Sequence, residues 1–374
     1  MRYRTLGRTG LKVGEIGLGT EYLNGPSRET VGAVVAEAVE AGVNYFDVLY
    51  SFPEYLDNLG AALRGRRDQV VLTVHLGCAE TDGQYRRSRD PEECDRNFHD
   101  MLRRLGTDRA DIIIVQNSDE QSDYEEILRP GGLLELALRL RGEGKGRFLG
   151  LSSHTVPVPQ RAVESGVYDV LMFSINAAFD ALPSEAGSWG ETGEKRDLNL
   201  ARRSLYQLCA HREVGLVAMK PFGGGRLLAP GDGLTAPSPV ECLSYVLSQP
   251  GVCTTVPGVK SVEELRASLH YCEATPEARD YSALVARSQS NLAKVCVYCN
   301  HCQPCPQEID IGQAMRLLDL ASLGLTEQLR RQYRTLPGGS PADCVECGAC
   351  QGRCPFGFDA GACMKRAAEV FAGE

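Results

Sequence analysis

Two runs of closely spaced cysteines near the end of the chain are the residues whose type and spacing point most directly to chemistry. In the first run a cysteine stands at every third position, and the second run has one extra residue before its last cysteine. The runs are Cys296, Cys299, Cys302 and Cys305, and Cys344, Cys347, Cys350 and Cys354, each followed by a proline. Because thiolates bind soft metals and short loops let several converge, this spacing predicts metal centres.

The second run, C-x2-C-x2-C-x3-C-P, matches the cysteine run of bacterial ferredoxins letter for letter, and the first run is one residue shorter. This resemblance implies two [4Fe–4S] clusters, in which the fourth cysteine of each run binds the cluster of the other run. One cluster would then be held by Cys296, Cys299, Cys302 and Cys354, and the other by Cys344, Cys347, Cys350 and Cys305. A pair of zinc sites is the alternative, but zinc requires neither the third cysteine nor the proline. With every iron held by a cysteine, we expect the clusters to carry electrons.

The distribution of the cysteines divides the chain. Of the fifteen cysteines, six are scattered singly from Cys78 to Cys272, and nine lie between Cys296 and Cys363. A chain of this size without an export signal is not expected to use them in disulfides. We therefore predict a first domain over residues 1–280 and a small, helical ferredoxin-like domain over 281–374. Two helices, at 313–323 and 326–333, are expected between the cysteine runs.

Composition excludes several partners. The chain has 374 residues with 43% hydrophobic and 24% charged residues, and its net charge is 40 minus 49, or −9. An acidic chain without a basic block is a poor candidate for binding nucleic acid or an anionic membrane. No apolar run approaches the ~20 residues of a membrane span, and the polar start lacks a signal-peptide pattern. We expect a cytoplasmic protein.

The first domain alternates short apolar runs with stretches of helical periodicity, and eight of the runs read as strands buried on both faces. They are Glu15–Gly19, Val43–Val48, Val70–His75, Ala110–Gln116, Arg147–Ser152, Asp169–Asn176, Gly215–Pro221 and Cys253–Pro257. Eight such units in this length predict an α/β fold, a (β/α)8 TIM barrel. A doubly wound sheet would require a Gly-rich fingerprint after the first strand, where Tyr22 replaces its last glycine. The segment from Asp180 to Asp197, with Trp189, is either a disordered insertion or a lid.

Four motifs resemble the aldo-keto reductases that carry a C-terminal ferredoxin domain. The run from Tyr3 to Val13 is similar to the N-terminal hairpin of that family, and Gly42–Asp47 is similar to its second strand. The segments Lys220–Leu227 and Val256–Gly258 are similar to the loops after its seventh and eighth strands. The resemblance covers nearly the whole chain and implies the barrel, an oxidoreductase activity and the two clusters.

The catalytic positions depart from the family pattern. The family reduces carbonyls by hydride transfer from a nicotinamide, with Asp, Tyr, Lys and His around the substrate oxygen. Here Asp47 is kept, but the Tyr, Lys and His positions hold Phe52, His75 and Gln116. A phenyl ring cannot donate a proton, so the family mechanism cannot run unchanged. We expect His75 or the nearby Tyr50 to donate the proton, with Asp47 orienting the donor.

The cofactor positions are only partly retained. The family's nicotinamide-binding glutamine corresponds to Met172, and its adenine-binding pair corresponds to Ala267 and Ser268. The groups that remain for NAD(P)H are Ser152, Asn176, Lys220, Gly223, Gly224 and Gly225. A Gly-rich loop with a nearby lysine suits a phosphate, although the glycines also suit a tight turn alone.

Three functions remain open from the sequence. The first is an iron–sulfur oxidoreductase whose barrel binds a small organic substrate and whose clusters exchange electrons with an external carrier, a ferredoxin or flavoprotein. The second is an NAD(P)H-dependent aldo-keto reductase in which the clusters serve as an electron relay. The third is a non-catalytic electron-transfer or redox module. The ionisable residues at the expected barrel mouth favour the first, and the changed catalytic positions favour the third.

Overall fold

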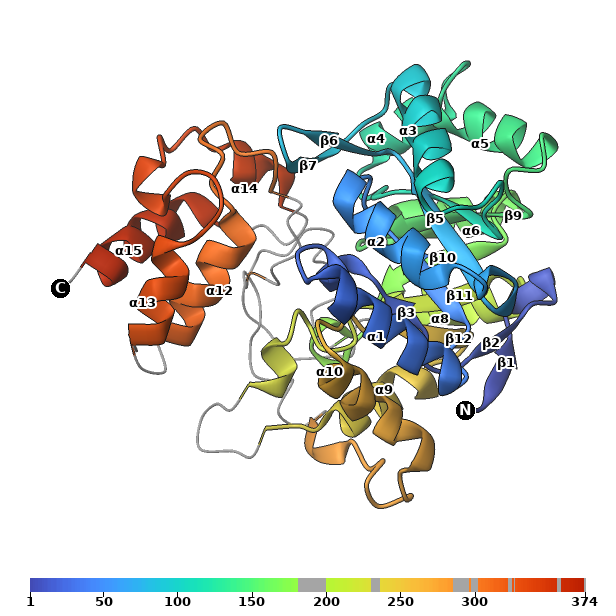
Figure 1. Cartoon of the computed structure of the whole chain (residues 1–374). Coiled ribbons are helices and arrows are strands. Elements are labelled where there is room, and N and C mark those ends of the chain that lie inside the picture. Colours follow the sequence, from blue (N-terminus) through green and yellow to red (C-terminus); the bar gives the residue numbers. More distant parts are fainter. Residues whose placement is uncertain are drawn as a thin grey trace. The chain divides into compact units, whose positions relative to one another are not determined.

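The structure is a computed structural model that describes residues 1–180, 200–229, 236–284, 296, 302–321, 325, 327–354 and 358–372. The described chain forms two units (Figure 1). The larger unit contains Met1–Ala79 and the described residues from Arg87 to 284, and the smaller unit contains Glu80–Arg86 and the described residues from 296 onward. Within these residues, no helix has the length and apolar character that a membrane crossing requires.

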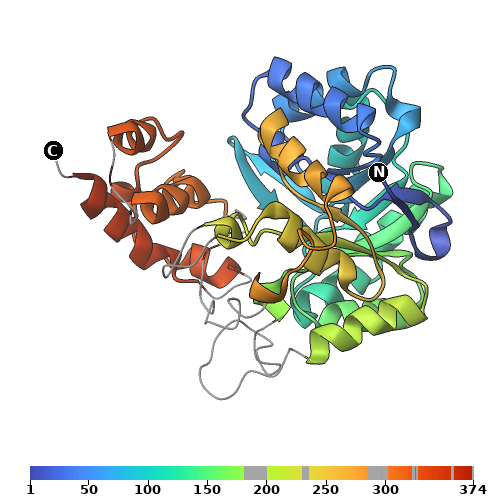
Figure 2. The ribbon, with the colours of Figure 1, turned by 90° about the horizontal axis from the view of Figure 1, so that it is seen from below.

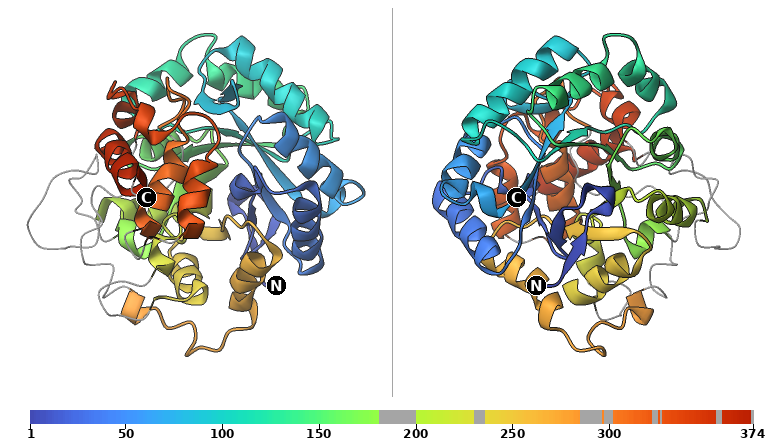
Figure 3. Two further views of the ribbon diagram at one scale, coloured as in Figure 1. Left: turned by 60° about the vertical axis from the view of Figure 1, so that its left-hand side comes forward. Right: turned by 90° about the vertical axis from the view of Figure 1, so that its right-hand side faces the viewer.

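The larger unit is built on an eight-stranded parallel sheet in the order β12-β11-β10-β9-β8-β5-β4-β3. Two parallel bridges, Ile16 with Thr255 and Gly19 with Gly258, bring the outer strands together, so the sheet is nearly closed into a barrel (Figure 3). The strands are β3 (Leu18–Gly19), β4 (Tyr45–Val48), β5 (Val71–Leu76), β8 (Ile112–Val115), β9 (Phe148–Ser153), β10 (Val170–Ser174), β11 (Gly215–Met219) and β12 (Val252–Val256). This confirms the predicted α/β barrel.

Helices follow the strands and surround them (Figure 3). They are α1 (Arg28–Glu40), α2 (Pro53–Leu63), α3 (Pro91–Arg104), α4 (Gln121–Leu128), α5 (Leu133–Gly142), α6 (Pro157–Ser165), α7 (Ala177–Asp180), α8 (Leu200–His211), α9 (Pro239–Ser248) and α10 (Val262–Leu269). Their starts are encoded locally. Asp90 caps α3 and Ser238 forms a capping box with Glu241 on α9, each followed by a proline in the first turn.

The barrel core explains the strand sequences. Every residue of three strands is buried: four in β4, four in β8 and six in β5. Such burial is expected for strands covered on both faces. One end of the barrel is closed by the hairpin of β1 (Tyr3–Thr5) and β2 (Lys12–Gly14), because Leu6 and Val13 pack into the same core cluster as Ile112. Arg4 donates to the carbonyl of Val252, the first residue of β12, so the hairpin covers the amino ends of the strands. The carboxyl ends are left to form the mouth.

The smaller unit is mainly helical (Figure 2). Its helices are α12 (Ile311–Ala321), α13 (Glu327–Arg334), α14 (Ala349–Arg353) and α15 (Ala360–Ala372), and α12 and α13 are the helices predicted between the cysteine runs. Its core contains Ile309, Ile311, Met315 and Met364, with several cysteines packed against it. The hairpin of β6 (Cys78–Thr81) and β7 (Gln84–Arg87), which follows β5, was not predicted.

Candidate active site

Asp47 and His75 form a buried pair at the carboxyl ends of neighbouring strands. In the register of β4 and β5, Asp47 lies beside Thr73, so His75 is two residues further along and its side chain points to the same face. Nε2 of His75 lies 2.9 Å from Oδ1 of Asp47, and the two side chains are 2% and 11% exposed. Because an ionised carboxylate only accepts, Nε2 carries the proton and the carboxylate fixes the ring. The other ring nitrogen, Nδ1, is buried and has no hydrogen-bond partner among the described residues.

Tyr50 contacts a different acid, Glu21. Its hydroxyl donates to Oε1 of Glu21 at 3.1 Å, and its ring lies edge-on to Phe52, with the centroids 5.2 Å apart. Phe52 precedes the first turn of α2 as its N-cap residue. The structure therefore brings Phe52, at the position of the family tyrosine, and Tyr50, the competing proton donor, into one aromatic contact.

A second tyrosine, Tyr55 on α2, supports Asp47 and was not singled out from the sequence. Its hydroxyl shares a hydrogen bond with the hydroxyl of Thr20, which also donates to the carbonyl of Asp47 at 2.5 Å. Burial raises the pKa of Tyr55, and the charge of Asp47 adds to this rise. The phenol thus stays protonated and fixes the backbone of Asp47. The sequence signal was a tyrosine in the first turn of the helix that follows Asp47.

Gln116 and Asn117 lie just beyond β8, on the side of the barrel where β5 ends. The backbone N–H of Gln116 donates to the carbonyl of Leu76 at 2.9 Å, and the side chain is buried. Asn117 has a φ of 51°, an uncommon backbone conformation for this residue. Its N–H donates to Oγ of Ser152 at 2.9 Å, so Ser152 holds this turn in place. Strained residues of this kind gather at functional sites.

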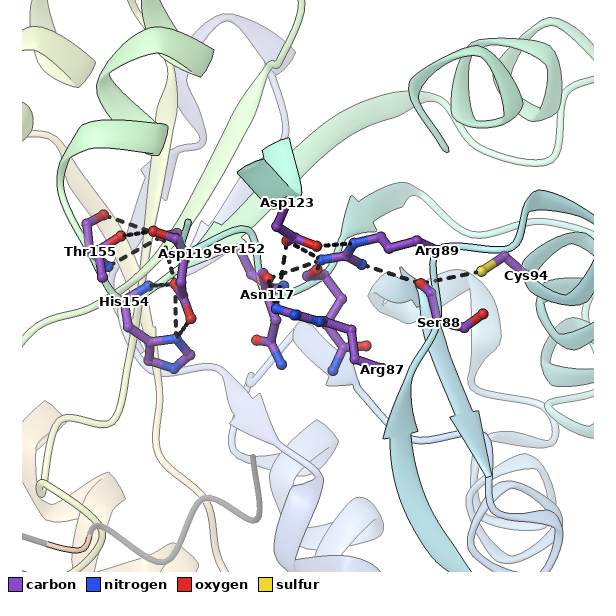
Figure 4. A network of polar contacts seen from close by, with 12 residues as sticks. Arg87, Ser88, Arg89, Cys94, Asn117, Asp119, Asp123, Ser152, His154 and Thr155 are labelled. Atoms are coloured by element: carbon purple, nitrogen blue, oxygen red, sulfur yellow. Dashed lines mark hydrogen bonds and ion pairs between the residues drawn. The ribbon is translucent and has the colours of Figure 1, made fainter. Parts of the chain in front are cut away.

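An arginine–carboxylate network surrounds that turn (Figure 4). Arg89 makes a two-pronged contact with Asp123, at 2.8 and 2.7 Å, and its Nη2 also donates to the carbonyls of Gln116 and Asn117. Arg87 donates to the same carbonyl of Asn117 at 3.2 Å. Sequence analysis missed both arginines, because the hairpin that carries them to the mouth has no strong strand pattern.

A second imidazole–carboxylate pair lies after β9. Asp119 accepts the backbone N–H of His154 at 2.6 Å and the hydroxyl of Ser153 at 2.8 Å, and it also lies 3.1 Å from Nδ1 of His154 (Figure 4). The His154 side chain is 1% exposed. His154 is therefore a buried, hydrogen-bonded residue of the loop after β9.

The loop after β11 carries the retained cofactor candidates. Lys220, Gly223, Gly224 and Gly225 all have positive φ, between 56° and 90°. Two backbone hydrogen bonds form tight turns in this loop. The N–H of Gly223 donates to the carbonyl of Lys220, and the N–H of Gly225 donates to the carbonyl of Phe222. Asn176 supports it, donating from Nδ2 to the carbonyl of Lys220 at 2.9 Å and accepting the N–H of Phe179. Lys220 has no ion-pair partner in the part of the chain that the structure describes.

A buried ionic group lies beside the mouth. Asp180 accepts from Arg202 at 2.7 Å, from Tyr206 at 2.6 Å and from Tyr245 at 2.8 Å. Burial raises the pKa of Tyr206, and the Asp180 charge opposes its ionisation as well. These contacts join α7, α8 and α9. The segment predicted as an insertion or lid lies outside the described residues, apart from Asp180 itself.

The smaller unit contains a cavity lined by cysteines. Cys302, Cys305, Cys344, Cys347 and Cys350 line it, together with the apolar residues Ile309, Ile311 and Met364. Burial raises the pKa of Cys350, and the neighbouring thiols Cys344 and Cys347 add to the rise. Among the described residues, no three His, Cys, Asp or Glu side chains converge closely enough to hold a single metal ion. Cys299 lies outside the described residues.

Comparisons with known proteins identify the family of the chain. Residues 13–241, more than half of the chain, match the model of the aldo/keto reductase family, and the chain therefore belongs to that family. As a member of it, the chain is an oxidoreductase. The uncharacterized oxidoreductase YqkF of Bacillus subtilis (strain 168) is 27% identical over 73% of this chain and 92% of its own length. Pyridoxal 4-dehydrogenase of Microbacterium luteolum is 26% identical over 62% of this chain and 73% of its own length.

The fold agrees with a solved relative. The holo form of aldo-keto reductase AKR11C1 from Bacillus halodurans superposes with a TM-score of 0.59 and 24% identity, covering 80% of this chain and 98% of that one. This likeness supports the barrel architecture alone.

Proposed function

We propose that the chain reduces or oxidises a small organic carbonyl or alcohol compound at the carboxyl end of the barrel, with NAD(P)H as its cofactor and the Asp47–His75 pair as its proton-transfer group. The observation that carries the proposal is the buried Nδ1 of His75, which lacks a partner among the described residues beside a carboxylate that fixes the ring. A buried polar atom without a partner costs free energy, about 1–3 kcal/mol, that a bound substrate would recover.

The chain's own residues define the proton transfer. Asp47 holds Nε2 of His75, so only Nδ1 can exchange a proton with a bound substrate. A ring nitrogen of an imidazole can accept a proton and donate it again, which suits either direction of the reaction. The hydrogen bonds from Thr20 to the backbone carbonyl of Asp47, and from Tyr55 to Thr20, hold the backbone that carries this carboxylate. Gln116 lies on the neighbouring strand end, and we assign it to the wall of the substrate site.

The residues at the mouth fit a nicotinamide dinucleotide, which when bound would supply the hydride. Lys220 has no ion-pair partner in the described chain, and a Cβ at Gly225 would meet no atom within 4 Å, so the loop is open to a phosphate. The Ser152 hydroxyl accepts from Asn117 and still has its own proton to donate. Asn176 holds the backbone of the loop, and we place it among the cofactor residues as a support for Lys220.

Binding and turnover of the cofactor test this proposal. We expect NADPH or NADH to raise the melting temperature of the protein and to be oxidised in the presence of short aldehydes, with Lys220→Gln weakening the binding. Arg161→Gln removes an exposed charge from α6 and serves as the matched control. A protein that binds neither nucleotide contradicts the nicotinamide part of the proposal.

A second candidate function is favoured by the cavity in the smaller unit. We propose that residues 281–374 form a ferredoxin-type domain with two [4Fe–4S] clusters, held by Cys296, Cys299, Cys302 and Cys354, and by Cys344, Cys347, Cys350 and Cys305. All four ligands of the second set line the cysteine cavity. A cubane takes each thiolate on a different iron, so it needs thiols around a cavity rather than three ligands converging on one ion. When bound, the clusters would supply one-electron transfer between the barrel and an external carrier, a ferredoxin or flavoprotein.

Reduction by different donors separates the two functions. A protein that reduces an aldehyde with NADPH alone supports the first, whereas a protein that requires a reduced ferredoxin or flavoprotein supports the second. If neither donor supports turnover while the clusters are reduced and reoxidised, the barrel is a non-catalytic part of an electron-transfer protein.

A further inference from the structure

Positive charge exceeds negative charge in the arginine network at the barrel mouth. Arg89 and Asp123 neutralise each other through the two-pronged contact, and the Arg89 side chain is only 7% exposed. Arg87 reaches the same carboxylate only at 3.6 Å, and its side chain is 41% exposed. One carboxylate therefore faces two guanidinium groups, so these three side chains carry a net positive charge, and Arg87 is the more accessible of the two arginines.

The Arg87 guanidinium also has unused donors. Of its five N–H groups, those on Nη1 contact the carbonyl of Asn117 and approach Asp123, and in the described part of the chain Nε and Nη2 donate no hydrogen bond. A planar fork of this kind matches the two oxygens of a carboxylate. The turn that receives Arg87 is centred on Asn117, whose positive φ marks a position held in an unfavourable conformation.

We propose that Arg87 binds a carboxylate group of the substrate, so that the enzyme acts on small carboxylate-bearing carbonyl or alcohol compounds. This inference rests on the proposed function, because it names the substrate class of the same site. It goes beyond the proton-transfer pair, since it assigns a binding role to a residue of the hairpin after β5.

Arg87 and His75 both lie near the carboxyl end of β5. The N–H of Ser88 donates to the carbonyl of Gly77 at 2.9 Å, so Arg87 lies beside the chain just beyond the end of β5. His75 is two residues before Gly77, and at about 3.3 Å per residue the backbones of these two residues lie roughly 7 Å apart along the strand. We therefore expect the carboxylate of the substrate to be a different group from the reacting carbonyl or alcohol.

A structural role alone does not account for Arg87. Its neighbour Arg89 is buried, and it already supplies both the ion pair with Asp123 and the hydrogen bond to the Asn117 carbonyl. Removing the Arg87 charge should consequently leave the turn intact. A cofactor phosphate is the other anion that this guanidinium could bind, and the experiment distinguishes the two sources.

The experiment measures the binding of 4-formylbenzoate and of its neutral methyl ester by isothermal titration calorimetry. We expect the wild-type protein to prefer the acid, and Arg87→Gln to weaken binding of the acid by about 10- to 100-fold, the loss of one charge-assisted contact, without changing the ester. Arg86→Gln is the matched control, because it removes the same charge one residue away, where the side chain points to the other face of the strand. Unchanged melting temperatures verify that the variants fold.

Three outcomes would overturn the inference. They are equal affinities of the wild-type protein for acid and ester, equal losses from Arg87→Gln and Arg86→Gln, and a loss of NADPH affinity in Arg87→Gln without a loss of acid affinity. The last outcome would assign the guanidinium to a cofactor phosphate. Because the assay measures binding at equilibrium, an inactive protein that still shows the Arg87-dependent preference would contradict the proposed reaction and leave the carboxylate site standing.

Discussion

The imidazole of His75, beside a carboxylate, differs in its chemistry from the lysine ammonium that is expected at this position in the family. An ammonium supplies a fixed positive charge that lowers the pKa of a neighbouring phenol, whereas an imidazole can itself give and take the proton. At the residue scale, the phenyl ring of Phe52 removes the partner that an ammonium would serve. In the proposed reaction, the pair of His75 with Asp47 would replace a two-residue proton donor by one residue and its orienting carboxylate.

The first prediction tests this pair. His75→Gln keeps a side chain of similar size that can still contact Asp47, but it cannot exchange a proton. We expect turnover to fall by about 100- to 10,000-fold, as for the loss of a general acid–base group, while substrate affinity changes little. Steady-state kinetics with an accepted substrate, together with the melting temperature, provide the measurement.

Tyr50 is the competing proton donor, and its variant is the control. Tyr50→Phe removes the hydrogen bond to Glu21 and keeps the aromatic contact with Phe52. We expect it to retain most of the activity. If Tyr50→Phe loses activity and His75→Gln does not, Tyr50 is the donor and the role of His75 is structural.

At the residue scale, side-chain neighbours that follow from the ends of strands could be predicted from the sequence. Side-chain neighbours that follow from hydrogen-bond networks could not. Asp47 and His75 could be paired because both follow from the ends of recognisable apolar strands. Arg87 and Asp119 could not be found in this way, because their roles depend on hydrogen bonds to turn carbonyls and backbone N–H groups. Such bonds are specified by tertiary geometry rather than by any spacing along the chain.

At the scale of elements, apolar strands were predictable and short polar ones were not. The eight barrel strands bury almost every side chain, which leaves a continuous apolar run in the sequence. The hairpin from Cys78 to Arg87 is short and largely polar, so its strands carry no such signal. The four-residue helix α7 is likewise too short for a helical period to be visible.

The third prediction concerns the ionic group that joins α7, α8 and α9. Asp180→Asn replaces the carboxylate that accepts from the buried Arg202 by a neutral amide, so the buried guanidinium loses this charge partner. We expect the free energy of unfolding to fall by about 3–5 kcal/mol, measured by chemical denaturation. Glu125→Gln, which breaks an exposed ion pair with Arg161, should cost less than about 1 kcal/mol. Similar losses in both variants would contradict the assignment.

At the scale of the whole molecule, the cysteine distribution predicts a second domain from residue 281 onward, but it carries no information on which barrel residues contact one another. Five cysteines of the two runs, Cys296, Cys302, Cys305, Cys344 and Cys350, pack against one small apolar core that α12 and α15 help to build. By contrast, the single cysteines of the barrel, such as Cys94 and Cys209, are buried among apolar side chains. For these two, burial raises the pKa of the thiol, as expected for structural residues.

The last prediction follows from this contrast between two kinds of cysteine in one chain. If the two runs bind cubane clusters, protein prepared without oxygen should be brown and contain about eight irons and eight acid-labile sulfides per chain. Cys350 lines the cysteine cavity, and Cys350→Ala should therefore remove about half of the iron. Cys363 packs against the same apolar core but belongs to neither run, so Cys363→Ala is the matched control and should keep the full iron content.

A colourless protein with one or two zinc ions would contradict the clusters. Equal iron losses in the two variants would show instead that iron is lost through damage to the core, because both residues share that core while only Cys350 is assigned as a ligand.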